Sequence, residues 1–212
     1  MIVAKDNNLQ IERLELGPFG TNAYIVICQK TWDSVLIDAP AEASTIIDSL
    51  KGTTLRYILV THNHVDHIDA LAELCSRLKA PLAVHALDAG NLPSPPEKLL
   101  SHGDTVSAGN LRFEILHTPG HTPGSLCFKV CHYLISGDTI FRGGPGKTWS
   151  PANFKQIIKS ITEEIFVLPD DVSIYPGHGN STSVKRERDE FTFFSSRLHD
   201  PGLCGNVIWL SS

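Results

Sequence analysis

Four side chains able to bind metal crowd into six consecutive positions: His62, His64, Asp66 and His67. They follow directly on an apolar run at 55–60. Imidazole nitrogens and carboxylate oxygens are the ligands that divalent zinc, iron and manganese accept. A solvated polar loop gains nothing from collecting so many of them, so the run predicts a metal site.

Three more side chains of the same kind stand downstream, each shortly after another segment that reads as a strand. His121 follows 112–116, Asp138 follows 133–135 and His178 follows 172–175. Loops at strand ends are held by a rigid scaffold and converge on one edge of a sheet. The sequence therefore predicts seven metal ligands, five histidines and two aspartates, gathered at such an edge.

The spacing of the first cluster divides the ligands between two ions. Side chains two apart in an extended stretch point the same way, so His62 and His64 can share one ion. Asp66 and His67 come where the chain turns into a helix expected from residue 68, and they reach a different point. Seven ligands require two ions about 3.5–4 Å apart, which a carboxylate can bridge. That role falls to Asp138.

A pair of ions predicts hydrolysis. It lowers the pKa of a shared water from ~15.7 towards ~7, so that a hydroxide bridging the metals serves as nucleophile. Asp66, beside that water, is the expected catalytic residue, which orients the water and passes a proton to the leaving group. No Gly-x-Ser-x-Gly elbow offers a serine nucleophile instead. Nitrogen and oxygen ligands admit Zn²⁺, iron or manganese, and Zn²⁺ is the first choice.

The order of these motifs resembles the metallo-β-lactamase superfamily, whose signature is His-x-His-x-Asp-His followed by a lone His, a lone Asp and a last His. The resemblance extends from 16 to about 188, and the stretches 137–143 and 175–179 are most similar to the glyoxalase II (hydroxyacylglutathione hydrolase) group, especially its short single-domain bacterial members. It implies His62, His64 and His121 on a first metal, Asp66, His67 and His178 on a second, and Asp138 bridging both. The implied activity is metal-dependent hydrolysis of small thioesters or related acyl compounds.

Two alternatives remain at this point. Persulfide dioxygenases of the same superfamily look similar but use only the first-metal trio, as a single iron site. A lactonase could use the same dinuclear site to open a cyclic ester. Counting the bound metal separates the dioxygenase from the hydrolases.

Candidate substrate contacts flank the ligands. Phe19 and Phe141 are expected to line an apolar wall. Arg142 and Lys147 follow Asp138 closely enough to meet a substrate carboxylate, and an inward-facing Tyr175 would stabilise an oxyanion.

The elements that must position these residues fit one domain spanning 1–212. Strands are expected at 9–16, 23–28, 34–38, 55–60, 82–85, 112–116, 125–130, 133–135 and 172–175, and helices at 42–50, 68–79, 151–165 and 184–195. Ser150 and Pro151 form a strong start signal for the third helix. Early hairpins followed by alternating strands and helices predict an α+β fold with two mixed sheets face to face. The resemblance implies the αββα sandwich with helices on the outer faces.

Composition narrows the setting. A formal charge of -5 without a long basic block speaks against nucleic acid as a partner. No run of about 18 apolar residues could cross a bilayer. Five cysteines without Cys-x-x-Cys spacing fit a reducing cytoplasm. We therefore expect a cytoplasmic enzyme whose partner is a small-molecule acyl substrate, with the oligomeric state left open.

Overall fold

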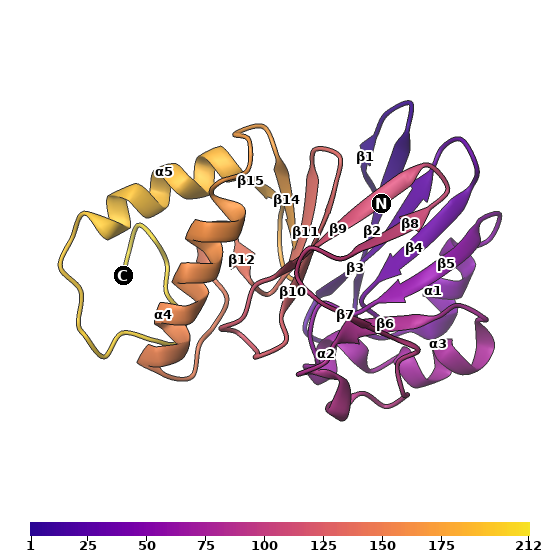
Figure 1. The fold of residues 1–212 in the computed structure, drawn as a ribbon, viewed down its shortest axis with the longest axis horizontal. Coiled ribbons are helices and arrows are strands. Elements are labelled where there is room, and N and C mark those ends of the chain that lie inside the picture. Colours follow the sequence, from indigo (N-terminus) through magenta and orange to yellow (C-terminus); the bar gives the residue numbers. More distant parts are fainter.

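Two β-sheets lie against one another, with helices outside both of them (Figure 1). The computed structural model describes residues 1–212. The first sheet has seven strands in sequential order: β1 (Ile2–Lys5), β2 (Leu9–Leu16), β3 (Thr21–Cys28), β4 (Asp33–Ile37), β5 (Thr54–Leu59), β6 (Leu82–His85) and β7 (Lys98–Leu100). It is mixed, because β1 to β4 pair antiparallel and β4 to β7 pair parallel.

The second sheet is also mixed. Its order is β15 (Thr182–Ser183), β14 (Ser173–Pro176), β11 (Tyr133–Gly137), β10 (Leu126–Val130), β9 (Leu111–His117) and β8 (Thr105–Ala108). Only β11 and β14 pair parallel. A small hairpin of β12 (Ile140–Phe141) and β13 (Gly144–Pro145) follows β11.

Five α-helices complete the layers: α1 (Ala43–Ser49), α2 (Val65–Ile68), α3 (Leu71–Arg77), α4 (Pro151–Ser160) and α5 (Val184–Ser195). Figure 1 shows α1 and α3 outside the first sheet and α4 and α5 outside the second. A π-helical turn, Ile161–Ile165, continues α4. None of these helices combines the length and the apolar character that crossing a membrane requires.

Strand β3 shows how the sequence builds the sandwich. All eight of its residues are buried. Tyr24 and Val26 pack in the core between the sheets, while Ile25 and Ile27 pack in the core beneath α1 and α3. Side chains of a strand alternate between its faces, so the stretch 23–28, covered on both faces, is apolar throughout. A third core lies between the second sheet and helices α4 and α5.

The predicted fold class is confirmed, and each expected strand is present with small shifts at its ends. The start of α4 is as predicted, with the Ser150 hydroxyl accepting a hydrogen bond from Asn153 N. Short strands β1, β7, β8, β12, β13 and β15 were not predicted.

The helix expected at 68–79 differs from the prediction. The chain forms the single turn α2 from Val65 and then the separate helix α3 from Leu71, so Asp66 and His67 lie on a helical turn and not before one. Apolar periodicity marks only the residues that pack on the sheet, which is why the sequence pattern placed the start too late.

Candidate metal centre

The seven predicted ligands come together, although they belong to elements of both sheets. His62 and His64 follow β5, Asp66 and His67 lie on α2, His121 follows β9, Asp138 follows β11, and His178 follows β14. Because β10 is antiparallel to both β9 and β11, and β14 is parallel to β11, the last three loops leave the second sheet at the same edge. The ligands form three groups in which the ligand atoms lie within 4.8 Å of one another.

The first group consists of His62, His64 and His121. His64 Nδ1 lies 3.1 Å from His62 Nε2 and 2.9 Å from His121 Nε2. Nitrogen atoms that share a tetrahedral zinc ion at ordinary bond lengths stand roughly 3.3 Å apart. The three nitrogen atoms therefore have the spacing of a common ion.

The second group consists of Asp66, His67 and His178. Asp66 Oδ2 lies 3.2 Å from His178 Nε2 and 3.7 Å from His67 Nε2. Thr21 donates its hydroxyl to the same carboxylate oxygen over 3.1 Å. The carboxylate is thus aimed at the two imidazoles.

Asp138 forms the third group with His62 and His67, and it therefore lies between the first two groups. Its Oδ1 is 3.3 Å from His67 Nε2, and its Oδ2 is 3.4 Å from His121 Nε2 and 3.7 Å from His178 Nε2. One carboxylate therefore reaches ligands of both groups, which is the arrangement that a bridging ligand requires.

Two buried atoms of this cluster test its fit to metal ions. His67 Nε2 and Asp138 Oδ1 are buried and make no hydrogen bond. A buried polar atom without a partner costs about 1–3 kcal/mol, and such atoms are uncommon in native proteins. Divalent cations would satisfy both atoms, and nitrogen and oxygen donors without sulfur suit zinc, iron or manganese. The residues present fit a metal centre.

Outer hydrogen bonds fix which ring nitrogen of a histidine faces the site. His121 Nδ1 donates to the carbonyl of Lys147 over 2.8 Å. His67 Nδ1 donates to Asp38 Oδ2 over 2.8 Å. With Nδ1 held in this way, Nε2 is the ring nitrogen that faces the other ligands, and in the neutral ring it is the atom that offers a lone pair, as a metal-binding histidine needs. Asp38 also accepts from Thr61 N and Thr61 Oγ1, at 2.8 and 2.7 Å.

Asp88 ties two of the ligand loops together. It is completely buried. Its carboxylate accepts from Asn63 N at 3.2 Å, from Thr122 Oγ1 at 2.7 Å and from Gly124 N at 2.9 Å. Asn63 stands between two ligands and Thr122 follows another. Our sequence reasoning missed Asp38 and Asp88, and the available signal was a polar residue just past a buried strand.

Burial and the neighbouring ligands shift the pKa of several side chains in the cluster. Burial, followed by the neighbouring imidazoles, holds the pKa of His62 well below its ordinary value, so the ring is neutral. Burial alone would lower the pKa of His67, but the carboxylates of Asp38 and Asp138 outweigh it and raise the pKa to about 10. The hydrogen bond from His178 holds the pKa of Asp66 well below its usual range, so this group is a carboxylate at neutral pH.

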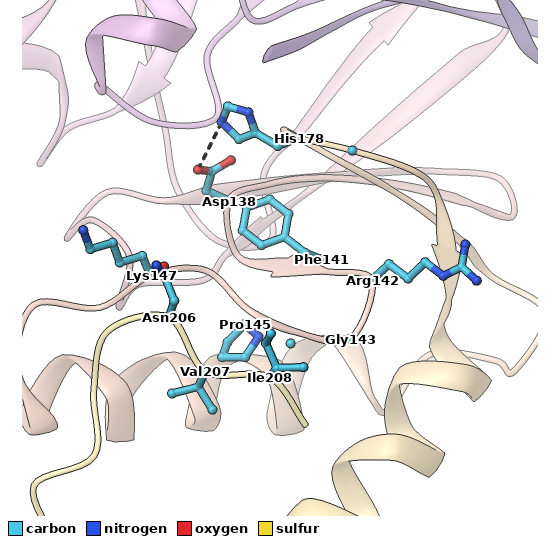
Figure 2. A pocket seen from close by; sticks show the side chains of 12 residues that line it. Asp138, Phe141, Arg142, Gly143, Pro145, Lys147, His178, Asn206, Val207 and Ile208 are labelled. Atoms are coloured by element: carbon cyan, nitrogen blue, oxygen red, sulfur yellow. Dashed lines mark ion pairs between the residues drawn. The ribbon is translucent and has the colours of Figure 1, made fainter. Parts of the chain in front are cut away.

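Three of the five predicted substrate residues line a pocket beside the ligands. Phe141, Arg142 and Lys147 share with Asp138 and His178 a cavity of about 440 Å³ (Figure 2). The ring of Phe141 lies 6.1 Å from that of His178. Phe19 is exposed and lines a separate cavity of about 200 Å³ that borders Asp66. Cavities therefore open on two sides of the ligand cluster.

Tyr175 is not a substrate contact, and that expectation is wrong. The side chain is buried in the core between the sheets, and its hydroxyl donates to the carbonyl of Val3 over 3.3 Å. Its ring packs edge-on against Tyr24 with the centroids 5.9 Å apart. Tyr175 follows the alternation of β14, which turns its side chain inward to the core.

Two curated relatives match nearly the whole chain. The probable metallo-hydrolase YqgX of Bacillus subtilis is 32% identical over 86% of this chain and 96% of its own length. The hydroxyacylglutathione hydrolase GloC of Haemophilus influenzae is 28% identical over 89% of this chain and its full length.

Solved structures share the fold. The BLEG-1 B3 metallo-beta-lactamase superposes with a TM-score of 0.78 at 27% identity, covering 84% of this chain and 96% of its own. TTHA1623 in a di-iron-bound form superposes with a TM-score of 0.71 at 30% identity, covering 84% of this chain and 96% of its own. The sequence pattern of the Metallo-beta-lactamase superfamily matches residues 16–178, from the end of β2 to the last ligand. This chain is a member of the Metallo-beta-lactamase superfamily, with the histidine and aspartate metal-binding cluster of its hydrolases.

Proposed function

We propose that this protein hydrolyses small thioesters with two divalent metal ions, most simply Zn²⁺, held by the seven converging ligands. The observation that carries the proposal is the position of Asp138, whose two oxygens face ligands of both groups and one of which has no partner. A single ion held by the first group would leave Asp66, His67 and His178 without an ion to bind. The likeness to GloC, which is named as a hydroxyacylglutathione hydrolase, supports a thioester as substrate.

When bound, the ions supply an activated water near neutral pH and polarise the carbonyl of the substrate. Asp66 is the catalytic residue of this scheme. Its carboxylate, whose Oδ2 is oriented by the Thr21 hydroxyl beside His178, accepts the proton of the attacking water and delivers it to the leaving thiolate. Because its pKa is held low, Asp66 begins the reaction as a carboxylate.

The chain also orients the substrate. Phe141 offers an apolar surface directly below Asp138 and His178 in Figure 2, where a chain leaving the reacting carbonyl would lie. Holding the ester bond in one orientation is a large part of catalysis, because it replaces a bimolecular encounter with an organised complex.

Elemental analysis of protein purified without added metal, followed by an activity panel on the reconstituted forms, tests the proposal. We expect two ions per chain and faster hydrolysis of thioesters than of lactones or oxygen esters. Faster turnover of lactones would favour a lactonase, and one iron per chain with oxygen uptake on persulfides would favour a dioxygenase. The proposal fails if the fully loaded protein hydrolyses no thioester.

A further inference from the structure

The β12–β13 hairpin, residues 140–145, lies directly against the expected bridging ligand, Asp138. It begins two positions after Asp138, and the chain that returns from it packs on the Asp138 backbone. A side chain at Gly146 would collide with the carbonyl oxygen of Asp138, and Gly146 N donates to Thr139 O over 3.1 Å. The position of the hairpin therefore determines where the Asp138 carboxylate lies.

The turn of this hairpin is held from outside by a carboxylate on α5. Gly143 N donates to Glu187 Oε2 over 2.9 Å. The indole Nε1 of Trp209 donates to the same oxygen over 3.1 Å, and Trp209 N donates to Gly143 O over 2.8 Å. Glu187 and Trp209 are both completely buried. Both backbone hydrogen-bonding groups of Gly143 are thus bound by these two residues.

The other oxygen of Glu187 reaches the chain that follows His178. Thr182, in β15, donates its hydroxyl to Glu187 Oε1 over 2.5 Å. Thr182 comes four positions after His178, and α5 begins directly after β15 (Figure 1). Glu187 therefore joins the two segments that leave the ligands Asp138 and His178.

Glu187 forms no salt bridge, so hydrogen bonds alone compensate for its burial. The basic residues of α5 pair elsewhere: Lys185 with Asp189, Arg186 with Glu190 and Arg188 with Asp170. A buried charge without a cation adds little to stability, and an apolar residue would fill the same space at a lower desolvation cost. The carboxylate instead provides direction, because it accepts from three donors at fixed positions.

We propose that Glu187 is a positioning residue for the second ion. It fixes the hairpin behind Asp138 and the segment behind His178, so that both side chains face that ion. The inference rests on the proposed function, which places an ion at the second group. The loops of the first group have a separate support in Asp88, which does not contact the hairpin. Loss of Glu187 should therefore weaken the second ion and leave the first nearly unchanged.

Glu187→Leu and Glu187→Gln test the proposal together. Leucine has a similar size but accepts no hydrogen bond, so the hairpin turn loses its support. Glutamine keeps one oxygen for Gly143 N and Trp209 Nε1, and its amide group can donate to the Thr182 hydroxyl, which accepts as well as donates. Ile165→Ala is the matched control, because Ile165 is buried in the same core as Trp209 but belongs to no ligand loop.

Competition with a chelating indicator measures Zn²⁺ affinity, and ¹⁵N shifts of the His121 and His178 rings show which group holds the ion. We expect Glu187→Leu to weaken Zn²⁺ at the second group by about tenfold, the lower end of the effect of losing a partner outside the ligands. The first group should keep its affinity, and Glu187→Gln should restore the second. Ile165→Ala should lower the free energy of unfolding without changing either affinity.

Equal losses at both groups, no loss at the second group, or the same loss in Ile165→Ala would show that Glu187 only stabilises the fold, and would overturn the inference. A glutamine variant that binds Zn²⁺ as the leucine variant does would overturn it too. If Glu187→Leu does not fold, Thr182→Val removes one of the three bonds at a half-buried position. A smaller loss confined to the second group then supports the inference, and any other pattern overturns it.

Hydrolysis of a thioester by the zinc-loaded, unmodified protein separates this inference from the proposed function. If no thioester is hydrolysed but the second ion depends on Glu187, the proposed function fails and the positioning role stands. If thioesters are hydrolysed and Glu187→Leu leaves the second ion unchanged, the positioning role fails and the proposed function stands. A second group that binds no Zn²⁺ in the unmodified protein overturns both.

Discussion

The substitution Asp38→Asn keeps the shape of the side chain beside the metal centre but changes which ring nitrogen of His67 carries the proton. The Asp38 side chain is buried and makes three hydrogen bonds, two from Thr61 and one from His67 Nδ1. Asparagine has the same shape. However, its amide can supply only one acceptor oxygen where the carboxylate supplies two.

In the variant, the amide oxygen keeps its bond with Thr61 N, and the amide nitrogen then faces His67 Nδ1. That nitrogen atom donates, so His67 must move its proton to Nε2, the atom that faces Asp138 and Asp66. A protonated Nε2 cannot bind a metal ion. Loss of such an outer partner typically costs 10- to 100-fold in metal affinity, which is roughly 1.4–2.8 kcal/mol. We expect this loss at the second ion only, because the ligands His62, His64 and His121 do not contact Asp38.

Competition with a chelating indicator measures the affinity of each ion, and ¹⁵N chemical shifts of the histidine rings report the tautomer of His67. Asp33→Asn is the matched control. Asp33 is the first residue of β4 and Asp38 comes directly after the last one, but the side chain of Asp33 bonds to Thr31 and Arg56, away from the ligands. The control should bind both ions normally. Unchanged affinity for both ions in Asp38→Asn, or an unchanged His67 tautomer, would refute the reasoning.

Three further perturbations test other parts of the site. Asp66→Asn should lower kcat by about 10²- to 10⁴-fold and also weaken the second ion, because the group both carries the proton and belongs to the ligand group with His67 and His178; steady-state kinetics read beside the metal content of the same sample decide this. In metal-free protein, His67 stabilises the folded state because its pKa is raised to about 10. This contribution is complete below about pH 6.5 and is lost as the pH rises through about 10. Urea unfolding in the presence of a chelator should therefore give a smaller free energy of unfolding at about pH 10 than at about pH 6. Gly124→Ala should cost about 1–3 kcal/mol and weaken metal retention, since the added Cβ would lie 2.6 Å from Oδ1 of Asp88, whereas Gly90→Ala, with open space around it, should be near neutral in the same unfolding assay.

The ligands could be read from the sequence because each was marked locally. His121, Asp138 and His178 each stand within a few residues of the end of an apolar segment, and the dense cluster at 62–67 marks the first loop. Parallel strand ends are the usual place for such sites, so a local signal was enough to predict that these loops meet.

The supporting residues could not be read in the same way. The bonds of Asp38 to His67 and of Asp88 to Asn63 span 29 and 25 residues, and each aspartate stands alone in its segment. Tyr175 was misplaced for a related reason. It stands only three residues before the ligand His178, but the register of β14 against β11 turns it into the core. Which face a residue occupies depends on the register, and local composition does not specify it.

The origin of the ligands also links metal binding to folding. The loop and the helical turn after β5 of the first sheet supply His62, His64, Asp66 and His67, and loops of the second sheet supply His121, Asp138 and His178. Two ions that use all seven would join the sheets across the core that lies between them. Ligands that meet only in the folded chain bind metal ions only in the folded state. Tighter metal binding therefore raises the free energy of unfolding. The unpartnered atoms of His67 and Asp138 lie at this junction, and the contact between the sheets is therefore the part of the fold that metal removal should loosen first.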